Sequence, residues 1–255
     1  FLIAWHVALY LSVLFLEFCP AILEWLGWKT WRSLAVKLTI GATALGVILS
    51  TLHQSALGAL FLMAPARVHP LWYSPYIPVF FFISSIAAGI SIVIVITTLY
   101  RQSFRETYGP SALDEITLGL GKAAGVVLFT YFFLKVVGVA EGLHWDLLNT
   151  PMGHWFLVEI LVFVLLPSFL FSWAAQAGNV AMVRLTALLT VMGICINRLN
   201  ISIIGMNWNL VERYFPHWKE LVISLTIITF GVLTFRWIVN RMPVLREHPE
   251  FAWDH

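Results

Sequence analysis

The chain is dominated by uninterrupted apolar runs of about 20 residues, the length of an α-helix that crosses the hydrocarbon core of a bilayer. Of its 255 residues, 60% are hydrophobic and 11% are charged, whereas soluble domains carry about 25% charged residues. The sequence therefore predicts an all-α, polytopic transmembrane helical bundle that forms a single integral membrane domain over residues 1–255. Its predicted spans are residues 1–18, 35–62, 76–100, 114–139, 154–174, 181–205 and 218–241.

The first residue, Phe1, lies inside an apolar run and is not an initiator methionine. A cleaved signal peptide would not leave a mature chain that starts in the middle of a helix. We therefore expect further N-terminal helices to precede these spans.

Charge and cysteine content exclude several classes of protein. The net charge of +2 is small and its basic residues are scattered, so the sequence predicts no nucleic-acid partner. The two cysteines, Cys19 and Cys195, each stand alone in a helical context, which excludes an iron–sulfur cluster or a structural zinc in this chain. We expect no metal site here, and any metal cluster would belong to another subunit.

The distribution of Lys and Arg over the span ends predicts the topology, because cytoplasmic loops carry the excess of positive residues. The ends on the cytoplasmic side contain Lys29, Arg32, Lys37, Arg101, Arg105, Lys122, Arg184, Arg236, Arg241 and Arg246, and the opposite ends contain Arg67, Arg213 and Lys219. Loops 64–75, 140–153 and 206–217 are then predicted to face the periplasm or exterior. The expected location is the cytoplasmic (inner) membrane, crossed many times, with a cytoplasmic C-terminus.

Polar and ionisable side chains within the spans are predicted to gather in the outer leaflet. Such residues are costly in hydrocarbon and are candidates for function. Given the predicted topology, one layer contains His53, Gln54, Lys135, Glu159, Asn197, Arg198 and Asn200, and His6 on the first span can join it.

This layer has three possible uses. As a structural network, Lys135, Glu159 and Arg198 would form internal ion pairs, while asparagines would hydrogen-bond between helices. As a quinone pocket, it needs hydrogen-bond donors at the carbonyls and a group that exchanges protons, for which His53 is suited. As a haem site, His6 and His53 on neighbouring helices would clamp one iron. A two-haem cytochrome would need further histidine pairs, and the other six histidines lie in loops or tails.

The outer loop over residues 64–78 is dense in Pro, Trp and Tyr. It is either a rigid interfacial turn or a lid over the pocket that also docks an electron-transfer subunit. His69 within it would be a proton exit or, more simply, an exposed loop histidine. In the fourth span, Gly121 and Gly125 form a GxxxG pattern that predicts a close helix approach.

Four strings carry a resemblance to a known family. They are Leu-Glu-Phe-Cys-Pro-Ala-Ile-Leu-Glu-Trp-Leu-Gly-Trp (16–28), Leu-His-Gln-Ser-Ala-Leu-Gly-Ala-Leu (52–60), Val-His-Pro-Leu-Trp-Tyr-Ser (68–74) and Tyr-Phe-Pro-His-Trp-Lys-Glu-Leu-Val-Ile-Ser (214–224). Over nearly its whole length the chain resembles the NrfD/polysulfide reductase family of quinone-interacting membrane subunits, and within it the HybB type.

The resemblance implies a haem-free protein of eight to ten spans, built as two four-helix bundles. It would transfer electrons between a quinone, usually menaquinone, and a ferredoxin-like iron–sulfur subunit on the periplasmic face of a larger respiratory oxidoreductase complex. Matching positions make His53 and Gln54 quinone-pocket residues, Trp72 and Tyr73 the pocket rim, and Glu159 and Arg198 buried charges of the second helical half. His6 falls in no matching block.

The resulting expectation is a quinone-interacting electron-transfer subunit with no complete active site of its own. His53 would handle a proton, and the pocket would also include Asn197, Asn200 and His6. The alternatives are a haem b cytochrome subunit and a non-redox membrane anchor or ion-translocating subunit.

Overall fold

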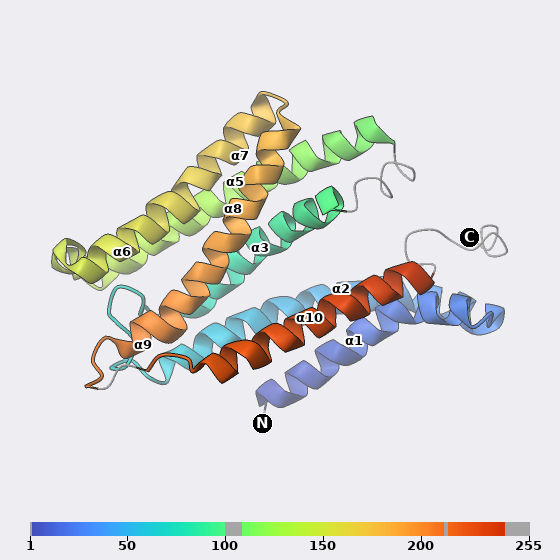
Figure 1. Ribbon diagram of the computed structural model, residues 1–255, viewed down its shortest axis with the longest axis horizontal. Coiled ribbons are helices and arrows are strands. Elements are labelled where there is room, and N and C mark those ends of the chain that lie inside the picture. Colours follow the sequence, from blue (N-terminus) through green and yellow to red (C-terminus); the bar gives the residue numbers. More distant parts are fainter. Residues whose placement is uncertain (1, 100–108, 212–213, 243–255) are drawn as a thin grey trace. The chain divides into compact units, whose positions relative to one another are not determined.

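The computed structural model describes residues 2–99, 109–211 and 214–242, and within these ranges the regular elements are helices (Figure 1). Those long and apolar enough to cross a membrane are Ala4–Trp25, Lys29–Leu62, Ile77–Leu99, Pro110–Glu141, Pro151–Gln176, Val180–Asn207 and Trp218–Arg241. Each overlaps one predicted span, so the prediction of an all-α polytopic protein is confirmed.

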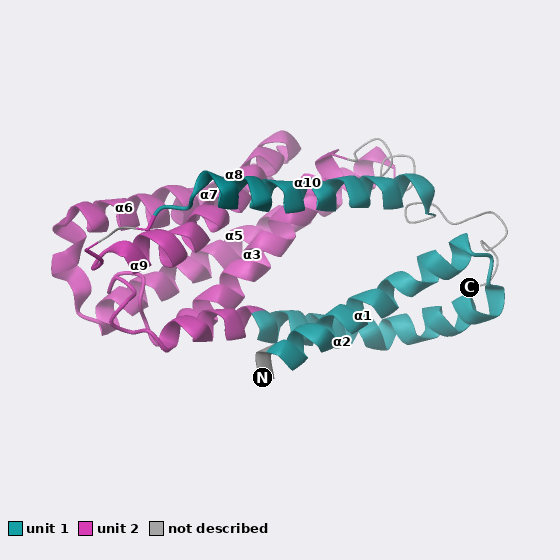
Figure 2. Cartoon of the chain, turned by 60° about the horizontal axis from the view of Figure 1, so that its bottom comes forward, with its two compact units in different colours: residues 1–53, 215–255 teal, residues 54–214 magenta. Residues whose placement is uncertain are grey.

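The chain divides into two compact units (Figure 2). Unit 1 comprises residues 1–53 and 215–255, and unit 2 comprises residues 54–214. The boundary falls between His53 and Gln54, inside the helix α2 (Lys29–Leu62). A single domain over residues 1–255 stays a prediction, and each unit is described by itself.

Unit 1 contains α1 (Leu2–Trp25), most of α2, and α10 (Trp218–Arg241). Val13 of α1 packs against Ala42 and Leu49 of α2. Between the two helices the chain turns at Gly27, whose φ of 75° is accessible to glycine at little steric cost.

The expected boundary between the first two spans is wrong by several residues on each side. The first span was predicted to end at residue 18 and the second to begin at 35, but the helices run to Trp25 and from Lys29. The reason is a buried ion pair, in which Nε of Arg32 lies 3.0 Å from Oε2 of Glu24. Pairing neutralises the two charges and lets them remain within helices.

Among the described residues, unit 2 contains the end of α2, from Gln54, and the helices between α2 and α10. In chain order they are α3 (Ile77–Leu99), α5 (Pro110–Glu141), the 3₁₀ helix η1 (His144–Asn149), α6 (Pro151–Ile160), the π-helical η2 (Leu161–Leu165), α7 (Leu166–Gln176), α8 (Val180–Leu199), the π-helical η3 (Asn200–Ile204) and α9 (Gly205–Asn207). Thr150 caps α6 by accepting from the Gly153 N–H, and Asn179 caps α8 by accepting from the Met182 N–H.

Small residues let α5 approach α7 and α8 closely, as the GxxxG pattern predicts. A Cβ on Gly121 would lie 2.9 Å from Cγ1 of Val183, and a Cβ on Gly125 would lie 3.0 Å from Oγ of Ser172. The core around this contact is apolar and includes Phe80, Ala87, Ile94, Leu128, Phe171 and Ala187. This packing holds the polar residues of α3, α5 and α8 in the interior of unit 2.

Candidate functional site

A buried carboxylate forms the centre of the polar cluster in unit 2. Glu159, near the end of α6, is 1% exposed. Its carboxylate accepts hydrogen bonds from Nε1 of Trp72 at 2.8 Å, from Nδ2 of Asn197 at 2.5 Å and from Nδ2 of Asn200. One indole and two amides thus replace the water that this charge has lost, which is what burial of a charge requires. The interhelical role expected for the asparagines is confirmed.

Arg198 joins this cluster through Asn197. Its guanidinium donates to Oδ1 of Asn197 at 3.0 Å, to Oγ of Ser84 at 2.8 Å and to the carbonyl of Phe81 at 3.3 Å, and its Cζ lies 3.7 Å from the centroid of the Phe81 ring. The structural alternative expected a direct ion pair with Glu159. Among the described residues the hydrogen bonds run through the amide instead, because Asn197 is itself bonded to the carboxylate.

Lys135 of α5 lies among aromatic rings. Its side chain is 2% exposed, and Nζ lies 5.2, 5.7 and 5.8 Å from the ring centroids of Phe80, Tyr131 and Phe156. Ring faces attract an ammonium group, most strongly where water is excluded. The expected ion pair between Lys135 and Glu159 is absent among the described residues, where no carboxylate oxygen lies within 4.0 Å of Nζ.

The two π-helical turns in the described part of unit 2 occur beside this cluster. Segment η2 begins two residues after Glu159, and η3 begins at Asn200 itself. Oδ1 of Asn200 also accepts from Nε1 of Trp155 at 3.1 Å. Such turns are rare and occur frequently at functional sites, because the extra residue changes where side chains point.

The loop over residues 64–78 is anchored in unit 2 by buried side chains. Trp72 is 1% exposed, with its indole N–H on Glu159. The expectation of an exposed His69 is wrong. This residue is 5% exposed, and its ring lies edge-on to Trp72 and Trp208. Its ring Nδ1 accepts from the Leu71 N–H at 3.2 Å, and its backbone N–H donates to the Gly205 carbonyl. Aromatic neighbours fill the space that water would occupy.

Burial of His69 makes the stability of this loop depend on pH. Burial, and secondly the charge of His144, lower the pKa of His69 below its ordinary value of 6.5. The His69 ring therefore takes up a proton more readily in the unfolded chain than in the folded one. The stabilisation that comes from burying the neutral ring is present at a pH above the ordinary pKa of histidine and is lost as the pH falls below it.

We expect His69→Asn to flatten this dependence, because its side-chain oxygen can still accept from Leu71 but does not titrate. Thermal unfolding in detergent between pH about 7.5 and about 5.5 measures it. His154→Asn, at an exposed histidine, is the control and should keep the slope of the unmodified protein. An unchanged slope in His69→Asn would contradict the assignment.

A second cluster lies in unit 1, between α1 and α2. The rings of His6 and His53 are nearly parallel, with centroids 6.4 Å apart, and the ring of Tyr10 lies 6.3 Å from that of His53. Nε2 of His6 donates to the carbonyl of Leu49 at 3.0 Å. Nδ1 of His53 is buried and has no hydrogen-bond partner among the described residues.

The predicted site residues thus fall into two groups. His6 and His53 lie together in unit 1, and Trp72, Glu159, Asn197, Arg198 and Asn200 lie together in unit 2. Gln54 follows His53 on the same helix and is half-buried, as is Tyr73 in the loop.

The sequence analysis missed several contributors, among them Tyr10, Ser84 and Tyr131. Tyr10 and Tyr131 stand four residues from His6 and Lys135, and this spacing on one helix face was a usable signal. Nothing in the sequence distinguished Ser84 from other serines in the spans.

Comparison with known proteins adds a family context. A family model described as polysulphide reductase, NrfD, matches residues 1–208. The chain is 48% identical over 254 residues to a protein of Nitratidesulfovibrio vulgaris strain Hildenborough that carries no descriptive name, covering 98% of this chain and 66% of the relative. No solved structure matches the chain significantly.

Two further relatives have descriptive names. The probable Ni/Fe-hydrogenase 2 b-type cytochrome subunit of Escherichia coli K12 is 30% identical over 245 residues, covering 94% of this chain and 61% of the relative. The menaquinone reductase integral membrane subunit of N. vulgaris is 24% identical over 281 residues, covering 96% and 64%. The chain thus spans about two thirds or less of the length of these relatives.

Proposed function

The chain belongs to the NrfD polysulphide reductase family, and on that premise we propose that it is the quinone-interacting membrane subunit of a respiratory oxidoreductase complex. It exchanges electrons between menaquinone, or another quinone, and a ferredoxin-like iron–sulfur subunit on the periplasmic face. It lies in the cytoplasmic membrane with its C-terminus on the cytoplasmic side. A relative named as a menaquinone reductase subunit supports this choice of substrate.

The observation that carries the proposal is the unpartnered Nδ1 of His53. A buried polar atom without a hydrogen bond costs about 1–3 kcal/mol, so its persistence indicates a partner that binds there. A quinone carbonyl accepts a hydrogen bond from this nitrogen, and the neighbouring Val13, Ala42 and Leu49 provide apolar surface. The residues present therefore fit a quinone.

When bound, the quinone carries two electrons together with two protons. His53 binds the carbonyl side and passes a proton, because an imidazole changes its charge near neutral pH. The rings of His6 and Tyr10 are each nearly parallel to the ring of His53, and the hydrogen bond from His6 to the Leu49 carbonyl fixes the His6 ring. In unit 2, Glu159 forms a polar cluster of its own with Trp72, Asn197, Arg198 and Asn200.

Titration of the purified complex with a fluorescent quinone-analogue inhibitor tests this proposal directly. We expect saturable binding that menaquinone analogues displace, and His53→Ala should weaken it at least about tenfold, the effect of losing roughly 1.4 kcal/mol of binding. The control variant His154→Ala should bind normally, since this histidine is exposed. Absence of analogue binding would favour a membrane anchor or an ion-translocating subunit.

A second candidate function is that of a haem b subunit. It is favoured by a relative named as a b-type cytochrome subunit and by the parallel rings of His6 and His53. Haem ligation would use a nitrogen of each ring, and one nitrogen of His6 is bonded to the Leu49 carbonyl. A reduced-minus-oxidised spectrum of the isolated subunit distinguishes the candidates. Bands typical of haem b that disappear in His53→Ala would show that this residue binds haem and would overturn its proposed role at the quinone.

A further inference from the structure

One end of unit 1 is rich in tryptophan. Trp25 is the last residue of α1, Trp28 and Trp31 flank the start of α2, and Trp237 lies near the end of α10. The rings of Trp25 and Trp237 meet edge-on with centroids 6.4 Å apart, so these helix ends lie together. All four side chains are at least 50% exposed. Because tryptophan is enriched where a span meets the polar surface of a bilayer, we expect this end to lie at the level of the lipid headgroups.

The same end carries an excess of positive charge. We call residues 24–32 and 236–241 the basic end of unit 1. They contain four basic side chains and one acidic side chain, which gives a net charge of +3; these are Lys29, Arg32, Arg236, Arg241 and Glu24. Basic residues at a membrane surface attract anionic lipids.

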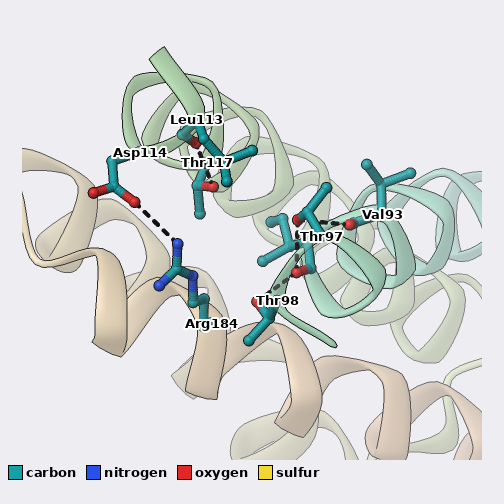
Figure 3. Close-up of polar contacts among 8 residues, drawn as sticks. Val93, Thr97, Thr98, Leu113, Asp114, Thr117 and Arg184 are labelled. Carbon is teal, nitrogen blue, oxygen red and sulfur yellow. Dashed lines mark hydrogen bonds and ion pairs between the residues drawn. The ribbon is translucent and has the colours of Figure 1, made fainter. Parts of the chain in front are cut away.

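Charge at a helix end can also be balanced within the protein, as it is near the starts of α5 and α8 in unit 2. There Nη2 of Arg184 lies 3.0 Å from Oδ1 of Asp114, and the two side chains point toward each other (Figure 3). Glu24 and Arg32 form a pair of the same length at the basic end of unit 1. Since this end has more basic than acidic side chains, its own segments cannot balance the remaining positive charge.

An open pocket of about 450 Å³ lies at this end, and its lining consists of Trp28, Lys29, Thr30 and Trp31. Ligand pockets in proteins commonly measure about 300–1,000 Å³. The Lys29 ammonium and the Thr30 hydroxyl are hydrogen-bond donors for phosphate oxygens, and the lining contains no acidic side chain. The pocket therefore has the chemistry of a site for a phosphate group.

An apolar stripe of α2 starts at this pocket. Leu34, Leu38 and Leu45 follow Trp31 at helical spacing, so they lie on one face of the helix. They are 50%, 54% and 47% exposed. From Trp31 to Leu45 the helix rises about 21 Å, which exceeds the roughly 15 Å depth of one leaflet of the hydrocarbon core. A stripe of this length fits an acyl chain, which a soluble anion lacks.

We propose that the pocket over residues 28–31 binds the phosphate group of an anionic phospholipid, one acyl chain of which lies along the α2 stripe. Lys29 and Thr30 contact the phosphate oxygens. The net positive charge of the basic end selects an anionic headgroup over a zwitterionic one. This site is independent of the proposed quinone chemistry, and its test measures lipid binding alone.

Native mass spectrometry of the whole complex, purified in a neutral detergent and stripped of lipid, measures this binding. The complex is titrated with phosphatidylglycerol and, separately, with phosphatidylcholine that has the same acyl chains. We expect phosphatidylglycerol to bind at least about tenfold more tightly. Equal affinities for the two lipids would overturn the proposal.

Variants assign the binding to the pocket. Lys29→Gln should weaken phosphatidylglycerol binding at least about fivefold, the effect of one basic residue at a membrane surface, and Lys29→Arg should retain it. Lys122→Gln is the matched control, because it removes an exposed lysine of α5. If Lys29→Gln binds phosphatidylglycerol as tightly as Lys122→Gln does, the pocket is not the site.

Competition separates a lipid site from a site for a free anion. Inorganic phosphate should not displace phosphatidylglycerol, because it cannot contact the α2 stripe; displacement by phosphate at equal concentration would overturn the proposal. Should Lys29→Gln fail to assemble, Thr30→Val against Thr39→Val decides the question. Thr39 donates to the Ala35 carbonyl within α2 and does not line the pocket, so only Thr30→Val should weaken binding.

Discussion

Replacement of His53 with alanine is expected to lower quinone-linked electron transfer by about 100-fold or more, the usual contribution of a positioned proton-transfer group. The variant loses the one buried ring nitrogen of the α1–α2 pair that has no partner among the described residues. Dye-linked activity at the partner subunits should remain, because that reaction does not pass through this chain. Steady-state assays of the purified complex with a quinone and with a dye measure both rates.

The matched control for this change is His154→Ala, which removes an exposed histidine of α6 and should retain both rates. His53→Gln offers a graded comparison, since an amide can hydrogen-bond a carbonyl but cannot exchange a proton near neutral pH. It should restore analogue binding in part without restoring turnover. Normal quinone turnover in His53→Ala would refute the role proposed for this residue.

Replacement of Glu159 with alanine is expected to destabilise unit 2 by about 3–5 kcal/mol, the cost of removing one partner from a buried charged network. Trp72, Asn197 and Asn200 would each lose the acceptor of an N–H group. Lys135 would remain buried, and Arg198 half-buried, without their countercharge. The midpoint of thermal unfolding in detergent, followed by near-ultraviolet absorbance, measures the effect.

The control for this second change is Glu115→Ala, which removes an exposed glutamate of α5 and should leave the midpoint nearly unchanged. The unfolding midpoint of Glu159→Gln should lie between those of Glu159→Ala and Glu115→Ala. The amide keeps one acceptor oxygen, but its NH₂ group faces other hydrogen-bond donors. An unfolding midpoint of Glu159→Ala equal to that of Glu115→Ala would mean that the carboxylate does not hold the loop, α6 and α8 together.

The helices of this protein were predictable, and their ends less so. A run of about 20 apolar residues has one satisfactory structure in hydrocarbon, because an α-helix satisfies its own backbone hydrogen bonds. The junction between α1 and α2 was displaced because charge was read as a sign of a helix end. Glu24 and Arg32 form a buried ion pair, so their charges do not mark helix ends. This pairing is visible only in the structure, where the two side chains lie close together.

The polar residues of the site were predictable as a set, and their pairing was not. Their cost in hydrocarbon singled out His53, Glu159, Asn197 and Arg198 from the sequence. That Arg198 reaches Glu159 through Asn197, and that His69 is buried, depended on contacts between residues far apart in the chain. The rotation of each helix about its axis decides such contacts.

The sequence by itself determined that this chain crosses a membrane repeatedly as helices and carries ionisable groups within its spans. Only the tertiary structure decided which groups meet: His6 and Tyr10 with His53, and Trp72 and two asparagines with Glu159. The physical reason is that lipid and the bundle interior are equally apolar. A helix such as α3, which carries apolar side chains on every side, therefore shows little periodicity that says which face is buried.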